Sequence, residues 1–224
     1  MALITVTGLF VSSCNDISGE YVEQLYTDSQ KEKAVKACLT TSADSALNHI
    51  FKYDGFYGNE AYRIDFAPLR SSLFDTLDKH GAGFMTDSLI LKVNRLAEGC
   101  GQQLAPYVKK AIDTLVVIDP EYLLKGHSTA ITDYFKLNQS QFLKSSFQTP
   151  VAIRMNLLGI NSLWSSMNQE YNKYATNPLN FDIQNYVIER MLDGIYAEMG
   201  IEEALIRQDT SHRDADTKLF SNYD

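Results

Sequence analysis

Residues 183–199 read Ile-Gln-Asn-Tyr-Val-Ile-Glu-Arg-Met-Leu-Asp-Gly-Ile-Tyr-Ala-Glu-Met. Apolar residues recur at every fourth position of this stretch, and two more widen the same face: Ile183, Val187, Met191, Ile195 and Met199, with Tyr186 and Leu192 beside them. A recurrence of three to four residues is the period of an α-helix that buries one face. The stretch therefore predicts a long amphipathic helix, for which Asn180 is a candidate N-cap.

The same period continues through most of the chain, which has only five prolines and twelve glycines in 224 residues. We expect further helices over about 29–52, 67–79, 86–98, 120–125, 128–134 and 139–174, with a kink or a fresh start at Pro106. Alternation long enough for a sheet is absent from the sequence, although residues 61–66 could form one isolated extended piece. The sequence predicts an all-α protein, a single compact bundle of about six to eight helices over residues 28–220 with a tail at 221–224.

The composition excludes several classes of partner and site. Twenty Lys and Arg against 28 Asp and Glu give a net charge of −8, which argues against nucleic acid and against electrostatic adhesion to anionic lipid. The histidines are scattered, and the sequence lacks a zinc motif, a phosphate-binding glycine loop and a Gly-x-Ser-x-Gly elbow, so we expect no metal and no cofactor. Cys38 and Cys100 could pair in an oxidising compartment, or remain two half-buried thiols.

Residues 1–13, which precede Cys14, are largely apolar, and this segment ends with Val11-Ser12-Ser13. This pattern resembles a bacterial lipoprotein signal, in which the cysteine after the cleavage site is lipidated. We expect a signal peptide at residues 1–13, a lipid anchor on Cys14, a polar tether over 14–27 and a place in the bacterial cell envelope, facing the periplasm. A signal peptide normally opens with Lys or Arg, and none precedes Cys14. The alternative is a buried N-terminal strand or helix, with Cys14 in the core.

A set of polar residues stands where the bundle should close on itself: Asp54, Arg63, Asn94, Arg95, Glu98, Thr132, Tyr134 and Asp193. Asn94 and Glu98 share a helical face at four-residue spacing. We expect a buried arginine with a carboxylate partner, such as Arg95 with Asp193, and interpret the set as a structural clamp rather than a ligand site. Glu202 and Glu203 are expected on a solvated helix face.

At these residues the chain resembles a known bacterial family, the domain of unknown function 4197. The landmarks that match are Asp54-Gly55-Phe56 with Asn59, Arg63-Ile64, Gly83, Asn94-Arg95-x-Ala97-Glu98, Pro106, Ala111-Ile112, Leu124-x-Gly126, Thr132-x-Tyr134-Phe135, Tyr186-Val187, Leu192-Asp193-Gly194 and Ile206-Arg207. The resemblance implies an all-helical fold and, frequently, an export or lipoprotein signal. It implies neither an established activity nor catalytic residues. The chain departs from the family pattern at residues 65–68, where the family is richer in proline, and at 209–212, which lack the usual proline.

Two classes of function remain open. The first is a non-enzymatic envelope lipoprotein that binds a protein, a lipid or a cell-wall component, for which we expect a groove bordered by Phe56, Tyr57 and Tyr134. The second is a hydrolase that uses Glu98, Asp193 or Asp54 as acid or base around Arg95, which requires two of these carboxylates to converge in an open cleft. We favour the first, because polar clusters of this kind are more often structural.

Overall fold

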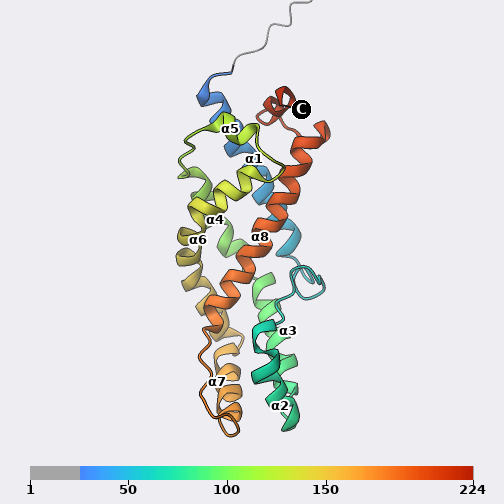
Figure 1. The fold of residues 1–224 in the computed structure, drawn as a ribbon, viewed down its shortest axis with the longest axis vertical. Coiled ribbons are helices and arrows are strands. Elements are labelled where there is room, and N and C mark those ends of the chain that lie inside the picture. Colours follow the sequence, from blue (N-terminus) through green and yellow to red (C-terminus); the bar gives the residue numbers. More distant parts are fainter. Residues whose placement is uncertain (1–25, 224) are drawn as a thin grey trace, which may run out of the picture.

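Helix α8 (Ile183–Gln208) runs obliquely across the front of an elongated bundle in the computed structural model, which describes residues 26–223 (Figure 1). The five apolar residues that recur at every fourth position of this helix, from Ile183 to Met199, are all buried. The helix begins at Asp182, whose carboxylate accepts a hydrogen bond of 2.9 Å from the backbone N–H of Asn185. The expected cap at Asn180 is therefore wrong by two residues, since only a side chain adjacent to the first turn reaches its free N–H groups.

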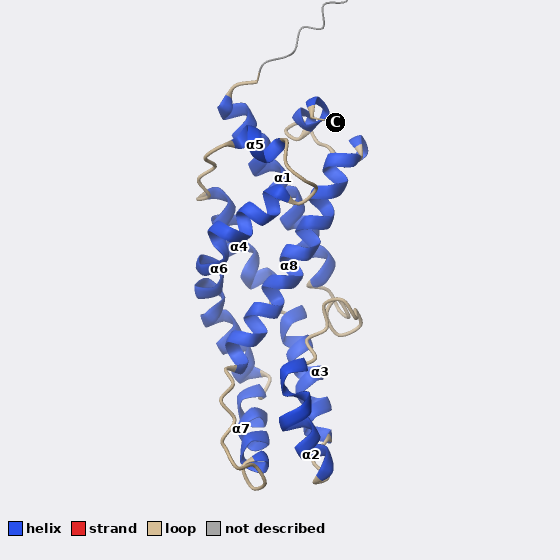
Figure 2. Cartoon of the chain, viewed as in Figure 1, coloured by secondary structure: helices blue, strands red, loops and turns tan. Residues whose placement is uncertain are grey.

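Two long helices, α1 (Asp28–Ile50) and α6 (Ala130–Leu157), contact α8 most extensively. The remaining ones are α2 (Asp75–Lys79), α3 (Phe84–Glu98), α4 (Gly101–Asp113), α5 (Pro120–Leu124) and α7 (Ile160–Tyr171). Within residues 26–223 the structure has eight α-helices and no strand, which confirms the all-α prediction (Figure 2). The start of α1, α5 and the C-terminal segment share one end of the bundle, and α2 and α7 lie at the other (Figure 1).

The prediction was wrong about where the helices of the second half end. The two helices expected over 128–134 and 139–174 are joined in the structure, where α6 runs without a break from Ala130 to Leu157 and contains Pro150. The break comes instead at Gly159, which has a φ of 67° and separates α6 from α7. A left-handed residue cannot continue a right-handed helix, and glycine adopts this conformation without a steric penalty. Gly159 was a stop signal that the sequence reading passed over.

The segment before α2 also differs from the prediction. Residues 61–66 make no strand, and residues 67–79 pass through a 3₁₀ turn and a π turn before the α-helix begins at Asp75. Phe66 precedes the first of these turns with a φ of 55°, a strained conformation for a bulky side chain. Its ring is fully buried and stacks on Tyr186 of α8 at a centroid distance of 5.2 Å. Packing against α8 thus holds the strained backbone in place.

At its N-terminus α1 begins one residue earlier than expected. Thr27 is the N-cap, and its side chain and that of Gln30 form a reciprocal capping box. In the middle of the chain, Pro106 lies inside α4 and does not start a new helix. Leu219 and Phe220, which directly precede the tail expected at 221–224, are both buried.

Both described cysteines are buried and free. Cys38 lies on α1 with no exposed surface, and Cys100 lies between α3 and α4 with 1% exposed. Burial raises the pKa of the Cys100 thiol to about 11, and that of Cys38 further. Over residues 26–223 no helix is long and apolar enough to cross a membrane.

A buried ion pair joins three helices near one end of the bundle. Glu203 of α8 has no exposed surface, and its carboxylate accepts hydrogen bonds from the backbone N–H groups of Ile131 and Thr132 in the first turn of α6, at 2.9 and 2.7 Å. Arg207 donates to Glu203 at 2.7 Å and to the carbonyl groups of Leu123 and Leu124 at the end of α5, at 2.9 and 2.8 Å. The expectation of a solvated face was wrong for Glu203.

Replacing Glu203 with glutamine tests this joint. The amide keeps the shape but leaves Arg207 buried without its counter-charge, and its N–H₂ group meets backbone donors. We expect Glu203→Gln to lower the free energy of unfolding by about 3–5 kcal/mol, the usual cost of breaking a buried pair. Urea unfolding followed by far-UV circular dichroism measures it. Glu202→Gln is the matched control, and equal losses from the two variants would contradict the assignment.

Candidate functional site

Asn94 on α3 holds the loop that connects α1 to α2. Its side chain is fully buried, accepts a hydrogen bond of 2.9 Å from the backbone N–H of Ile64, and donates one of 2.9 Å to the carbonyl group of the same residue. This is the pairing that a neighbouring strand would provide, supplied here by one amide side chain. The backbone N–H and carbonyl groups of Ile64, which no strand pairs, are satisfied in this way, because buried backbone groups need partners.

One turn later, Glu98 holds the other end of the same loop. Its Oε1 atom accepts from the backbone N–H groups of Phe56 and Tyr57, at 3.3 and 2.9 Å, and its Oε2 atom accepts from Arg95 at 2.5 Å. Arg95 also donates to Asp54 at 2.8 Å. Asn94 and Glu98, on the same face of α3, therefore hold the loop at two points. We call these four residues, Asp54, Asn94, Arg95 and Glu98, the α3 clamp.

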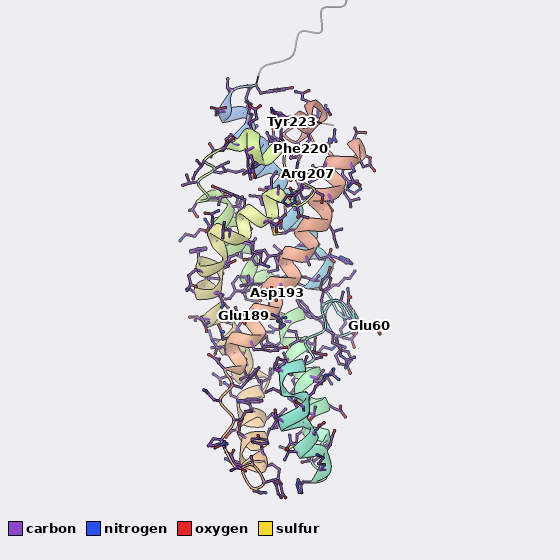
Figure 3. The ribbon with its side chains drawn as sticks, in the orientation of Figure 1. Glu60, Glu189, Asp193, Arg207, Phe220 and Tyr223 are labelled. Carbon is purple, nitrogen blue, oxygen red and sulfur yellow. The ribbon has the colours of Figure 1, made fainter. Side chains whose placement is uncertain are left out.

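The partner expected for Arg95 was wrong. Asp193 instead pairs with Arg190, one turn earlier on α8, at 2.6 Å, and lies 3.9 Å from Lys136 of α6. Asp193 lies near the middle of α8, whereas Arg207 lies toward the end that carries Phe220 (Figure 3). The sequence did not show that Arg95 would pair with Asp54, which lies in the turn after α1.

Aromatic rings enclose the guanidinium of Arg95. It lies 3.9 Å from the ring centroid of Tyr53 and 5.1 Å from that of Tyr57, whose ring also carries Arg63 at 4.6 Å. The hydrogen bond to Glu98, followed by the one to Asp54, raises the pKa of Arg95 further above its ordinary value. Arg95 is thus a permanent cation fixed by two carboxylates and two rings, which suits a structural role.

A groove follows the outer face of α8. It consists of two hollows of about 490 and 520 Å³ that share Asp193 and Ala197. Small residues of α8 form its floor, Gly194, Ala197 and Gly200. The first hollow is closed by the loop at residues 61–68 and by Tyr186 and Arg190, and the second by the start of α6 and by Tyr196 and Ile201. We call the two hollows together the α8 groove.

The structure divides the predicted polar set between two places. Asp54, Asn94, Arg95 and Glu98 form the α3 clamp, whereas Arg63, Thr132 and Asp193 line the α8 groove. The hydroxyl oxygen of Thr132 is buried without a hydrogen-bond partner. The remaining member, Tyr134, donates from its hydroxyl to the carbonyl group of Val116 at 2.8 Å. The groove expected between Phe56, Tyr57 and Tyr134 was wrong, since Phe56 is fully buried beneath the loop.

The sequence reading missed a second polar contact beside the groove. Glu198 of α8, 6% exposed, accepts at 2.7 Å from the Nδ1 atom of His49 at the end of α1. Burial, followed by hydrogen bonding with Glu198, raises the pKa of Tyr62. Tyr62 is one of the loop residues that line the first hollow. Over residues 26–223, His, Cys, Asp and Glu form no group that could hold a metal ion.

Comparison with known families assigns the chain. The family described as "Protein of unknown function (DUF4197)" matches residues 25–220. The chain belongs to this family. No curated protein matches the chain, and no solved structure matches it. The match covers the α3 clamp, the α8 groove and the Glu203–Arg207 joint, so these features lie within the family region.

Removing the side-chain amide of Asn94 tests the clamp. Asn94→Ala leaves the buried N–H and carbonyl groups of Ile64 without partners, at a cost of about 1–3 kcal/mol for each group. We expect a lower unfolding temperature and faster hydrogen exchange at the Ile64 amide. Asn138→Ala is the control, because Asn138 is exposed and bonds only within its own helix, to the carbonyl group of Tyr134. Unchanged exchange at Ile64 would contradict the clamp.

Proposed function

We propose that this protein is a non-enzymatic lipoprotein of the bacterial cell envelope, which binds a protein, a lipid or a cell-wall component through the α8 groove. The observation that carries the proposal is the groove itself, an open channel with a floor of small residues and mixed apolar and charged walls. Hollows of this size and composition are typical of binding sites.

The groove offers both apolar and polar contacts to a ligand. Tyr186, Tyr196 and Ile201 supply apolar surface along its walls. Arg190 and Asp193 neutralise each other, whereas Arg63 contacts no carboxylate within residues 26–223 and rests only on the ring of Tyr57. A ligand with an apolar body and an acidic or hydrogen-bonding group fits this distribution.

The carboxylates of the α3 clamp support a binding role over a hydrolytic one. Both oxygens of Glu98 are occupied, one by two backbone N–H groups and the other by Arg95. Asp54 is the second partner of Arg95. A general acid or base must exchange a proton with substrate in a cleft, whereas these groups hold a loop. Asp193, the third carboxylate considered for hydrolysis, lies in the groove and is paired with Arg190.

The lipoprotein part of the proposal rests on the sequence. Cys14 and the apolar residues 1–13 lie outside the described residues, and the pattern of a short apolar stretch, small residues and a cysteine supports an exported, lipidated chain. With a net charge of −8, a covalent lipid is a better means of attachment than electrostatic adhesion.

Metabolic labelling with a clickable fatty acid tests the anchor. We expect the wild-type protein to carry the label and to sediment with membranes, and Cys14→Ser to lose both properties, because lipidation needs the thiol. Cys38→Ser serves as the control, since Cys38 is buried and should not accept lipid. A wild-type protein that is unlabelled and remains in the soluble fraction would refute the lipoprotein assignment.

Site-specific photo-crosslinking in cells tests the groove. A photoreactive residue in place of Lys136, on the groove rim, should give a discrete crosslinked product that disappears when Ala197→Trp fills the junction of the two hollows. The same photoreactive residue in place of Lys79, exposed on α2 and outside the groove, is the control. A product that forms equally from both positions, or persists with Ala197→Trp, would argue against the groove.

A further inference from the structure

The segment between α4 and α5 turns two aliphatic side chains out into solvent. Leu115 is buried and Val117 packs against the core, whereas Val116 and Ile118 are 73% and 84% exposed. In an extended segment successive side chains point to opposite sides, so the two inward residues force the other two outward. Tyr122, on α5, adds a third large exposed side chain at 72%.

Hydrogen bonds fix this outward orientation. The hydroxyl of Tyr134 holds the carbonyl group of Val116, and Asp119 caps α5 by accepting from the backbone N–H of Tyr122 at 2.9 Å. Three residues of α5 itself, Pro120, Leu123 and Leu124, are buried and hold this helix against the core. The three exposed side chains therefore cannot turn inward without breaking these contacts. We call Val116, Ile118 and Tyr122 the apolar tip.

The apolar tip lies at the end of the bundle where the chain enters from its N-terminal segment. Glu121 of α5 is paired with Lys31 in the first turns of α1, and the start of α1 and α5 lie together in Figure 1. Cys14 precedes Tyr26 by twelve residues, which span at most about 43 Å when fully extended. The tether therefore restricts how far this end can move from a membrane that holds Cys14.

We propose that the apolar tip inserts into the interface of the lipid bilayer to which Cys14 is anchored, so that the bundle attaches to the membrane at this end. The inference rests on the proposed lipid anchor. Aliphatic and tyrosine side chains are suited to the boundary between headgroups and acyl chains. The tether supplies a high local concentration, so a contact too weak to hold the protein alone becomes occupied.

The charged residues near the apolar tip balance one another, which is compatible with a membrane contact made by apolar side chains. Lysines 109, 110 and 125 are matched by Asp113, Asp119 and Glu121 in the same part of the chain, so this region has no net charge. Exposed apolar groups also occur at the far end, where Phe84 at the start of α3 is 70% exposed. Of these exposed apolar groups, the apolar tip is the one at the tethered end, and for this reason we assign the membrane contact to it. Phe84, at the other end, provides a matched control.

Quenching of tryptophan fluorescence by brominated lipid tests the orientation. Ile118→Trp and Phe84→Trp are each introduced into the full chain together with Trp164→Phe, which removes the native fluorophore. Each protein is purified from membranes and reconstituted into phosphatidylethanolamine–phosphatidylglycerol vesicles with and without brominated phosphatidylcholine. We expect the Ile118→Trp protein to lose at least about half of its fluorescence, since rings at the interface lie near the acyl chains, and the Phe84→Trp protein to lose little. Val116→Trp provides a second probe if Ile118→Trp impairs folding.

Mass spectrometry of the same preparations separates the two proposals. A lipidated, vesicle-bound protein in which the Ile118 and Phe84 probes are quenched equally, or neither is quenched, would overturn the orientation and leave the anchor intact. The apolar tip would then be a surface for a protein partner. A chain without lipid on Cys14 would overturn the proposed anchor, and the orientation with it.

Discussion

Buried side chains that hydrogen-bond to the backbone of distant segments hold this bundle together. Glu98 binds two N–H groups of the loop after α1, Asn94 binds Ile64, and Glu203 binds the first turn of α6. An unpaired backbone group in a low-dielectric interior is costly, so each contact fixes a segment that helix formation alone leaves free. The two walls of the α8 groove, the loop at 61–68 and the start of α6, are the segments fixed in this way. The shape of the groove therefore depends on residues that do not face it.

The sequence predicted the fold class because helical periodicity is a local property. The stripe in α8 is spaced by four residues, and one further step from Met199 reaches Glu203, so its burial could have been read from the same register. The α3 clamp was also predictable in part, since Asn94 and Glu98 share a face. The partner of Arg95 was not, because tertiary packing decides which of several carboxylates lies across from it. The groove was misplaced for a related reason: whether Phe56 seals the core or lines a groove depends on how the loop is held.

Helix α8 serves the core and the surface at once. Its buried face carries large residues, whereas the α8 residues that line the groove include the small residues Gly194, Ala197 and Gly200, which leave room between the walls. At Gly200 an added Cβ would lie 3.1 Å from the Cγ2 atom of Thr129, so a larger residue there would crowd the start of α6. A single helix thus sets the width of the groove and the position of the helices around it.

The two buried thiols also determine how the chain responds to its chemical surroundings. With a pKa of about 11, Cys100 is a thiolate in roughly one molecule in ten thousand at neutral pH, and Cys38 in fewer. Disulfide exchange begins with a thiolate that can reach its target, and neither sulfur has the charge or the exposure to do so. The folded domain over residues 26–223 consequently presents neither thiol to an oxidant that approaches from the solvent.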